Sequence, residues 1–591
     1  MTASAESVPD WLLAPTAAVV ARRVAAPGEA VDAGATLLVL ESMKMQIPVA
    51  ARAAGRVTEW LVADGDTVTQ DQPLARFEAA ALPASGPQAA TADTGGGEPG
   101  RADLRARLHA TGDDARAEQR DARHARGYRT ARENVADLCD RDSFVEYGQL
   151  AVAAQRGRRD ADSLRRDTAA DGVITGRARI DGAEAAVIVN DYSVLAGTQG
   201  YFHHRKLDRM LGIARDERLP VVMFAEGGGG RPGDTDVTTQ VAGLELTTFA
   251  LWAGLRGVVP RVAVANGYCF AGNAALFGAA DITIATRRSW IGMAGPAMIE
   301  GGGLGKVAPT AIGPAAEQVD NGVVDLLAED EADATRLARR ALGLLRGTRV
   351  SGVAPDQQGI GALLPADRRY AYDVRRIVAQ LFDADSVLEL RAARGRAVLT
   401  ALARLDGRPV GVLASDCRHL GGAIDAEAAD KVADFVALCG RQGLPIVSLI
   451  DTPGFMVGPE SEAQGAVRRM SRLFAEGVQA PVPWLAVFLR RGYGLGAMAL
   501  AGGSFARPAY AVSWPSGEFG GMGLEGAVKL GYRRELEAIT DPEARQRRFD
   551  ALLAEAYERG RATEMAAHLE LDAVIEPERT RAVLTAVLGA D

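Results

Sequence analysis

The feature that most constrains this sequence is a duplication of its long C-terminal region, at an offset of 225 residues. ARIDG at 178–182 recurs as ARLDG at 403–407, and RLPVVMFAE at 218–226 recurs as GLPIVSLID at 443–451. Each copy runs as strand, glycine-containing turn, helix and strand, which predicts an α/β layer built by right-handed crossovers. Such a duplication indicates one site made from two similar halves, each supplying the same device to a different ligand.

A second, shorter repeat lies near the N-terminus, at an offset of 37 residues. AAPGEAVDAGATLLVLE at 25–41 matches VADGDTVTQDQPLARFE at 62–78. Short apolar runs separated by Gly-Glu and Gly-Asp turns predict strands joined by tight turns. Two such copies predict a small all-β antiparallel sandwich with pseudo-twofold symmetry. The segment ESMKMQIP at 41–48 lies between the copies, so we expect it to form an exposed turn.

The stretch between the two repeated regions has the composition of a linker. Residues 80–100 contain Ala, Pro, Gly, Ser and Thr with almost no large apolar side chain. Residues 101–140 alternate Arg with Asp and Glu, which predicts a solvated helix rather than a nucleic-acid arm. The expected organisation is a tail at 1–10, the sandwich at 11–79, a flexible linker at 80–100, and α/β halves at 101–345 and 346–591.

The overall composition excludes several classes of protein. The 591 residues are 48% hydrophobic and carry a net charge of −9, so no general basic field attracts nucleic acid. No apolar run reaches the roughly 20 residues that a spanning helix needs. No basic segment followed by an apolar one marks a secretory signal. The four cysteines form no CxxC motif. We therefore expect a cytoplasmic protein without a nucleic-acid or membrane partner.

Lys44 occupies the expected turn between the two copies of the short repeat. It is the only lysine in the first 200 residues, and Met43 and Met45 flank it. A lone exposed lysine is usually a solubilising charge, but the whole pattern resembles the biotinyl domain of biotin-dependent carboxylases. The modified lysine of that domain lies between two methionines, whereas the lipoyl domain usually places Asp before its lysine and Ala after it. The resemblance implies covalent biotin on Lys44, with lipoate or an unmodified lysine as alternatives.

Glycine clusters recur in both halves of the long duplication. The first half contains EGGGGR at 226–231 and Gly272 within CFAGNAA; the second contains Gly494 and Gly496 within YGLGAM. Glycines after a strand let backbone N–H groups approach a ligand without obstruction by Cβ, which makes an oxyanion hole. One isolated cluster would be an ordinary turn. Recurrence at matching register favours two oxyanion holes.

Other catalytic motifs are missing from the sequence. EGGGLGKVA at 300–308 lacks the first glycine of a phosphate-binding loop and has Val307 where Ser or Thr would bind Mg²⁺. The six histidines show no HxxxH or HExxH spacing, and no GxSxG elbow is present. We therefore expect no ATP site and no metal site. His203 and His204 are expected on a basic helix, either solvated or facing coenzyme A.

Residues 130–560 resemble the carboxyltransferase of acyl-CoA carboxylases, in the branch that includes the methylcrotonoyl-CoA and propionyl-CoA enzymes. Residues 189–224 and 444–458 carry this resemblance most specifically. It implies a duplicated α/β fold of the crotonase type. The family's Asp-Ser-Gly-Gly-Ala-Arg reads Glu-Gly-Gly-Gly-Gly-Arg at 226–231 here. Two further departures affect the family's oxyanion glycines, which read Gly272-Asn273 and Gly494-Leu495-Gly496.

The resemblance implies transfer of a carboxyl group from carboxybiotin on Lys44 to the α-carbon, or a vinylogous carbon, of an acyl-CoA. Gly272 and Asn273 of the N-terminal half would then hold the thioester enolate. Backbone groups of the C-terminal half would hold the ureido oxygen of biotin. The residues expected there are Gly494, Leu495 and Gly496, and the candidate substrate-binding residues are Gly228, Gly229, Arg231, Ala274 and Met498.

The resemblance also implies partners. Carboxylation of biotin consumes ATP with Mg²⁺, so we expect a separate biotin carboxylase subunit, together with a biotin protein ligase that modifies Lys44. Family members assemble as homo-oligomers, from dimers to hexamers. Two alternatives remain open. The chain could serve a biotin-dependent decarboxylase or transcarboxylase, or it could be a non-catalytic carrier and scaffold, because Asn273 and Leu495 depart from the family pattern.

Overall fold

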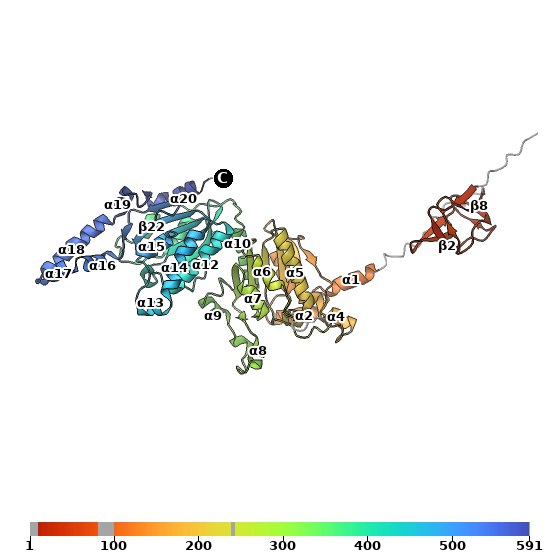
Figure 1. Cartoon of the computed structure of the whole chain (residues 1–591), viewed down its shortest axis with the longest axis horizontal. Coiled ribbons are helices and arrows are strands. Elements are labelled where there is room, and N and C mark those ends of the chain that lie inside the picture. The colour runs from red at the N-terminus through yellow and green to blue at the C-terminus, as the bar shows by residue number, and fades with distance from the viewer. Residues whose placement is uncertain (1–9, 81–99, 238–242, 590–591) are drawn as a thin grey trace, which may run out of the picture. The chain divides into compact units, whose positions relative to one another are not determined.

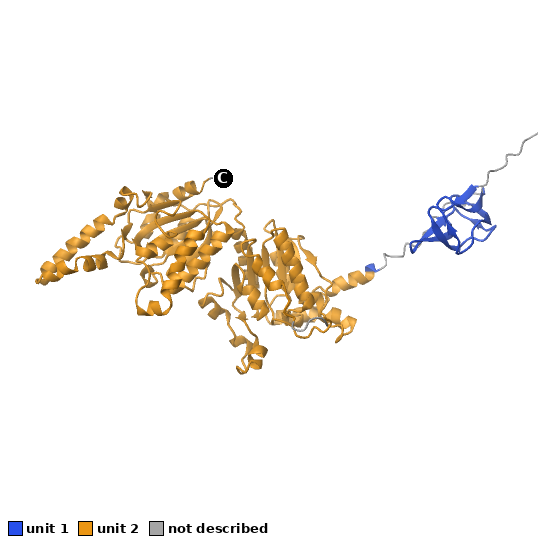
Figure 2. Cartoon of the chain, in the orientation of Figure 1, with its two compact units in different colours: residues 1–101 blue, residues 102–591 orange. Residues whose placement is uncertain are grey.

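The computed structural model describes residues 10–80, 100–237 and 243–589 (Figure 1). The chain divides into two compact units, residues 1–101 and residues 102–591 (Figure 2). Most of the expected tail and of the expected linker falls at residues 1–9 and 81–99, outside the described residues.

Unit 1 is a sandwich of two four-stranded sheets, in the orders β1-β8-β6-β3 and β5-β4-β2-β7. Strands β2, β3 and β4 recur as β6, β7 and β8 at the 37-residue offset, so the predicted all-β sandwich is confirmed. Its strands are β1 (Asp10–Leu13), β2 (Ala18–Arg23), β3 (Ala30–Val31), β4 (Thr36–Ser42), β5 (Met45–Ala50), β6 (Gly55–Trp60), β7 (Thr67–Val68) and β8 (Pro73–Ala79).

The core of unit 1 uses repeat-related side chains. Val20 and its repeat mate Val57 are both fully buried, as are Leu37 and its mate Leu74. Burying an aliphatic side chain of this size contributes about 1.5–3 kcal/mol. The indole N–H of Trp60 donates to the carbonyl of Ala25 across the sandwich, at 3.1 Å. These contacts hold β4 and β5 as a base for the hairpin between them.

The first half of unit 2 is built on a seven-stranded sheet in the order β17-β15-β13-β12-β11-β10-β9. Strands β9, β10 and β11 pair antiparallel, and from β11 onward the neighbours are parallel, as crossover connections require. The strands are β9 (Val145–Tyr147), β10 (Val173–Ile180), β11 (Ala183–Asn190), β12 (Val221–Phe224), β13 (Arg261–Ala265), β15 (Ile282–Thr286) and β17 (Leu326–Ala328), with a separate pair β14 (Tyr268–Phe270) and β16 (Trp290–Gly292).

Helices cover this sheet. The helix expected over 101–140 is present as three shorter helices, of which α3 begins with a capping box between Thr130 and Glu133. The helices are α1 (Arg101–Ala110), α2 (Ala117–Ala125), α3 (Ala131–Leu138), α4 (Ala161–Asp167), α5 (Tyr201–Asp216), α6 (Thr248–Gly254), α7 (Gly272–Gly278), α8 (Pro296–Gly301), α9 (Ala315–Asp320) and α10 (Glu331–Leu345).

The second half repeats the first on an eight-stranded sheet, in the order β18-β19-β20-β21-β22-β23-β25 with β24 paired to β22. Strands β10 and β11 recur as β19 and β20 at the 225-residue offset, so the predicted duplicated α/β fold is confirmed. The strands are β18 (Leu388–Leu390), β19 (Val398–Leu405), β20 (Arg408–Ser415), β21 (Ile446–Thr452), β22 (Trp484–Tyr493), β23 (Tyr510–Ser513), β24 (Glu518–Gly520) and β25 (Ala573–Val574).

The helices of the second half include the counterparts of α5 and α7, which are α12 and α15. Figure 1 shows α12 and α14 side by side over the sheet, and the two helices are in contact. The helices are α11 (Val374–Leu381), α12 (Ala426–Gln442), α13 (Pro459–Ala463), α14 (Ala466–Gln479), α15 (Gly494–Leu500), α16 (Leu524–Gly531), α17 (Arg533–Ala538), α18 (Pro542–Arg559), α19 (Ala562–Ala567) and α20 (Thr580–Leu588).

One hydrophobic core joins the two halves of unit 2. It contains Leu342 and Leu345 from α10, Val264 from the first sheet, and Val398 and Trp484 from the second. Helix α10 contacts β13 and β15 on one side and β19 and β20 on the other. The halves therefore form a single compact unit rather than two independent domains.

The expectation that His203 and His204 face solvent or coenzyme A is wrong. Their exposed fractions are 0% and 5%, because His203 packs against residues 169–172 and His204 packs against α6. Nδ1 of His203 lies 3.1 Å from the carbonyl oxygen of Asp171, and Nδ1 of His204 lies 2.9 Å from Oγ1 of Thr248. Burial lowers the pKa of both imidazoles.

None of the helices within the described ranges combines the length and the apolar character that crossing a bilayer requires.

Candidate functional site

Lys44 stands at the tip of the hairpin between β4 and β5. Ser42 pairs with Met45, so Met43 and Lys44 alone form the loop, with φ angles of 51° and 68°. Positive φ at both central residues is typical of the type I′ turn, whose twist suits a two-residue hairpin. The exposed fractions of Met43 and Met45 are 96% and 68%, and Lys44 is exposed as well. The amine of Lys44 is therefore available for covalent modification, with large apolar side chains on either side.

The N-terminal half places its glycine turn at the start of α7. Ala271, which precedes the helix, has φ 50° and ψ −120°, a conformation that a residue with a side chain rarely adopts. The first-turn amides of Gly272 and Asn273 have no carbonyl acceptor inside the helix. They also lie at the positive end of the helix dipole. This geometry suits stabilisation of a developing oxyanion.

The side chain of Asn273 points into the protein, whereas its backbone N–H stays among the first-turn amides of α7. Asn273 is fully buried, and its Oδ1 accepts a hydrogen bond of 3.0 Å from the backbone N–H of Gly229. A Cβ at Gly227 would clash with the carbonyl oxygen of Gly197 and with Nδ2 of Asn273. The close backbone approach of Gly197 therefore requires glycine at 227, and Asn273 packs into the same space.

Several other polar groups of the 226–231 loop are engaged within the protein. The N–H of Gly227 donates to the carbonyl of Tyr268 at 2.6 Å, and that of Gly228 donates to the carbonyl of Ala196 at 3.1 Å. Arg231 is buried and pairs with Asp171 at 2.5 Å and with Asp234 at 2.8 Å. These residues shape the loop beside α7, and the guanidinium of Arg231 already has two carboxylate partners.

A buried ionic network lies under this loop. The guanidinium of Arg123 donates to both carboxylate oxygens of Glu226, at 2.9 Å each. Glu331 lies 3.8 Å from Arg123, and Asn266 donates to both carboxylates, at 3.3 Å to Glu226 and 2.7 Å to Glu331. Burial, together with the neighbouring Glu331, raises the pKa of Glu226 to about 7 despite Arg123.

Sequence reasoning missed the partners in this network. Glu226 was noticed as the repeat mate of Asp451, but Arg123 lies on α2 and Glu331 at the start of α10. Neither belongs to a motif, and 208 residues separate 123 from 331 along the chain. The one available signal was the repeated acid itself, because a buried acid at a strand end requires a partner.

The C-terminal half contains a buried acid with arginine partners, similar to Glu226 in the N-terminal half. Asp451, at the end of β21, is fully buried and pairs with Arg490 at 2.9 Å and with Arg491 at 2.7 Å. Helix α15 then begins at Gly494, whose φ of 57° favours glycine. Leu495 in its first turn is 60% exposed. The first-turn amides of α15 therefore start at a surface that a ligand can reach.

A cavity of about 580 Å³ adjoins the start of α15. Gly494 and Met498 line it together with Phe505, Phe519 and Leu524. Gly494 and Met498, both expected site residues, are thus brought to one apolar cavity. Ala274, another candidate substrate-binding residue, is instead buried on α7. Figure 1 shows α7 and α15 over different sheets of unit 2.

In the part of the chain that the structure describes, no group of three or more His, Cys, Asp or Glu side chains is arranged to hold a metal ion.

Comparison with known families assigns both units. Residues 122–590 match the family described as "Carboxyl transferase domain". Residues 12–77 match the family described as "Biotin-requiring enzyme".

Individual relatives agree with these families. The methylmalonyl-CoA carboxyltransferase 12S subunit of Propionibacterium freudenreichii subsp. shermanii is 30% identical over 500 residues, which cover 82% of this chain and 92% of that protein. The biotin-dependent long chain acyl-coenzyme A carboxylase beta4 subunit of Mycobacterium tuberculosis is 30% identical over 505 residues, with the same coverage.

Solved structures are similar as well. A single-chain, multi-domain long-chain acyl-CoA carboxylase is 49% identical, with a TM-score of 0.79 over 99% of this chain. This chain spans 57% of the length of that protein. A transcarboxylase 12S structure is 28% identical, with a TM-score of 0.73 over 82% of this chain and 93% of that one.

Glu226 is expected to make stability depend on pH. Because its pKa is raised from 4.5 to about 7 in the folded chain, its contribution is fully present below about pH 4.5 and is lost as pH rises through about 7. Glu226→Gln removes this titration. The free energy of unfolding of the wild type, minus that of the variant, should fall by up to about 3 kcal/mol between pH 4.5 and 7.5.

Denaturant unfolding of both proteins across this pH range measures the difference. A constant difference would contradict the raised pKa. Glu329→Gln is a matched control, because Glu329 pairs with Arg287 at the surface.

Proposed function

The chain belongs to the carboxyl transferase domain family, with a biotin-requiring domain in the same polypeptide, and from this premise we propose how its residues divide the reaction. It is a biotin-dependent carboxyltransferase of the acyl-CoA carboxylase type with its own carrier domain. We propose that Lys44 carries the biotin and that the turns at α7 and α15 each stabilise one of the two anions of the transfer.

The observation that carries the assignment of Lys44 is its place at the exposed hairpin tip. The other lysine that is fully accessible in a loop of the described chain, Lys306, lies outside unit 1 and is not flanked by methionines. Biotin bound to Lys44 would supply the carboxyl group to be transferred. Residues 11–79 then act as the carrier, and we propose that the linker at 80–100 lets this carrier travel.

The reaction develops negative charge at two oxygens. Loss of the α-proton places charge on the thioester oxygen of the acyl-CoA, and release of the carboxyl group places charge on the ureido oxygen. We assign the first to the amides of Gly272 and Asn273 and the second to the amides of Gly494, Leu495 and Gly496. One such donor is worth about 10²–10³ in rate.

The buried ionic groups position these turns rather than react. Arg123 and Glu226 hold the strand end beside α7, and Asp451 with Arg490 holds the strand end beside α15. Neither acid is placed against the first-turn amides by any contact of the described structure. We therefore give the catalytic roles to backbone N–H groups and a positioning role to the ion pairs.

We propose a long-chain acyl-CoA as the substrate. The relative with 49% identity is a long-chain acyl-CoA carboxylase. The cavity of about 580 Å³ beside α15, which the homo-oligomer proposed below would bring to the α7 turn of a second subunit, is lined by Met498, Phe505 and Phe519. These apolar side chains suit an extended hydrocarbon group more than a short polar one. Transfer to a panel of acyl-CoA thioesters of increasing length tests this substrate class.

The proposed function requires partners. We propose that a separate biotin carboxylase subunit uses ATP and Mg²⁺ to load the biotin and that a biotin protein ligase modifies Lys44. We propose a homo-oligomer in which residues 101–345 of one subunit face residues 346–591 of another. Support comes from α7 and α15, which lie over different sheets (Figure 1), and from the hexamer assembly of the 28% identical transcarboxylase 12S. A cytoplasmic location agrees with four free, buried cysteines.

A transcarboxylase is the second candidate, because the 12S subunit of methylmalonyl-CoA carboxyltransferase is 30% identical. Turnover with a biotin carboxylase, bicarbonate and acyl-CoA separates the two. Stoichiometric ATP consumption supports the carboxylase, whereas carboxyl exchange between two thioesters without ATP supports the transcarboxylase.

Replacing Lys44 tests the carrier assignment. The chain coexpressed with a biotin protein ligase should gain the mass of one biotinyl group, and Lys44→Arg should abolish that gain and all biotin-linked transfer. Arginine keeps the charge but offers no amine for acylation. Intact-mass spectrometry measures the gain.

Lys306→Arg is the matched control, because the Lys306 side chain is 85% exposed. It should leave biotinylation unchanged. Biotinylation that persists in Lys44→Arg would exclude Lys44 as the attachment site.

Proline substitutions test the division between the two turns. Asn273→Pro removes one N–H donor from α7 and should slow carboxylation of acyl-CoA by about 10²–10³-fold, while decarboxylation of free carboxylated biotin without acyl-CoA is largely spared. Leu495→Pro removes a donor from α15 and should slow both reactions. Proline is tolerated in the first turn of a helix, so folding should survive. Steady-state rates of the two reactions provide the readout.

Alanine variants separate the backbone from the side chain. Asn273→Ala keeps the N–H but loses the hydrogen bond from Gly229, and Leu495→Ala keeps the N–H but loses an exposed side chain. Both should retain more activity than their proline counterparts. Equal loss of both reactions in two well-folded proline variants would refute the division.

A further inference from the structure

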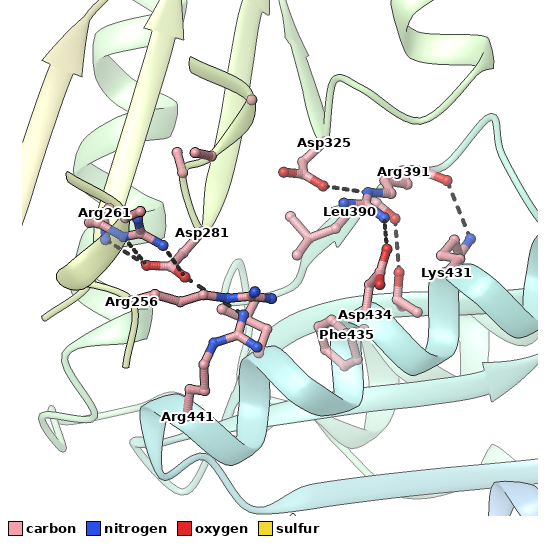
Figure 3. Close-up of a pocket in the computed structure, with 16 residues that line it drawn as sticks. Arg256, Arg261, Asp281, Asp325, Leu390, Arg391, Lys431, Asp434, Phe435 and Arg441 are labelled. Carbon is pink, nitrogen blue, oxygen red and sulfur yellow. Dashed lines mark hydrogen bonds and ion pairs between the residues drawn. The ribbon is translucent and has the colours of Figure 1, made fainter. Parts of the chain in front are cut away.

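A cavity of about 330 Å³ lies where the two halves of unit 2 meet, away from the turns at α7 and α15. Figure 3 shows side chains of both halves around it. The first half contributes Arg256, Arg261 and Asp281, and the second contributes Arg391, Lys431 and Arg441. Neither the carrier hairpin nor the proposed oxyanion turns supply a residue to this cavity. The cavity has no role in the reaction described above.

One end of the cavity has too few acceptors for its arginines. Asp281 is the carboxylate there, and Arg261 engages both of its oxygens, at 3.1 and 3.2 Å. Arg261 also donates to the carbonyl of Trp252 at 2.8 Å, so it is a satisfied, fully buried anchor. Arg441 reaches the same carboxylate only at 3.7 Å.

Two arginines at this end retain unused donors. The Nε of Arg441 is buried and has no hydrogen-bond partner among the described residues. The backbone N–H of Arg256 donates to the carbonyl of Ala253, but its guanidinium group has no hydrogen bond or ion pair within residues 10–80, 100–237 and 243–589. Figure 3 shows the guanidinium groups of Arg256 and Arg441 next to each other. Burial and the neighbouring Arg256 lower the pKa of Arg441. Three arginines thus share one carboxylate, which leaves this end with a net charge of about +2.

The other end of the same cavity provides an internal comparison. Arg391 pairs with Asp325 at 2.7 Å and with Asp434 at 3.0 Å. Lys431 donates to the carbonyls of Arg391 and Arg394, at 3.3 and 2.9 Å. Asp434 also pairs with Arg472, at 2.7 Å. The cations at this end therefore have carboxylate or carbonyl partners, whereas unused donors are found at Arg256 and Arg441.

We propose that this cavity binds a small dianion, carrying phosphoryl or dicarboxylate oxygens, between Arg256 of the first half and Arg441 of the second. Guanidinium groups bind such oxygens bidentately, and a partly enclosed site strengthens the interaction. Two adjacent guanidinium groups match two negative charges. The ligand would connect α12 with the chain between α6 and β13, and so it would link the two halves.

Hydrogen exchange of the full-length protein tests the proposal. Inorganic phosphate and malonate serve as separate probes at equal ionic strength and at a pH where both are mainly dianions, with chloride as the reference salt. At least one probe should slow exchange around residues 251–261 and 431–441 and should bind saturably in calorimetry. The probe that protects identifies which oxyanion chemistry the site accepts. Absence of protection by both probes at these segments would overturn the proposal.

Variants assign the binding to the cavity. Arg256→Gln and Arg441→Gln should each weaken binding of the protecting probe by at least about tenfold, because each removes a charged fork from the ligand. Arg547→Gln, on the exposed surface of α18, is the matched control and should bind like the wild type. Circular dichroism verifies folding, and since Arg256 is exposed its variant is expected to fold normally. Unchanged affinity in the folded double variant would refute the site.

Discussion

The hydrophobic core that both halves share is the constraint on which the rest of unit 2 depends. Leu342 and Leu345 of α10 pack into the same cluster as Val264 and Trp484, which belong to different sheets. The halves cannot separate without exposing this surface to water, a cost that grows with the apolar area. The turns at α7 and α15 are therefore fixed over different sheets. On the proposed division of the reaction, a complete site then requires a second subunit.

The junction between the two halves of unit 2 also explains the cluster of charged side chains beside the core. Duplicated α/β layers bury their sheet-facing side chains, but the faces by which the two copies meet are different surfaces of each copy. At this junction Arg261 and Asp281 come from one half, whereas Arg441 comes from the other. Nothing in the internal symmetry balances these charges, because residue 441 corresponds by the 225-residue offset to Asp216 on α5. The proposed dianion site is a product of the junction.

On the proposed division of the reaction, the buried ion pairs next to the two turns have a positional role. Glu226 with Arg123, and Asp451 with Arg490, repeat one arrangement at equivalent strand ends. A buried pair adds little net stability, but removal of one partner leaves an unpaired buried charge that costs about 3–5 kcal/mol. Asn273 also holds the loop, because its Oδ1 accepts the hydrogen bond of the Gly229 N–H.

The sequence by itself determined both duplications, the exposed turn that contains Lys44 and the place of each glycine turn, because repeats and turn residues can be read along the chain. It could not identify Arg123 and Glu331 as partners of Glu226, since they come from distant helices without a motif. It also misplaced His203 and His204, whose basic neighbours suggested a surface. Only the tertiary structure decided these points, because burial and charge pairing depend on which segments meet in space.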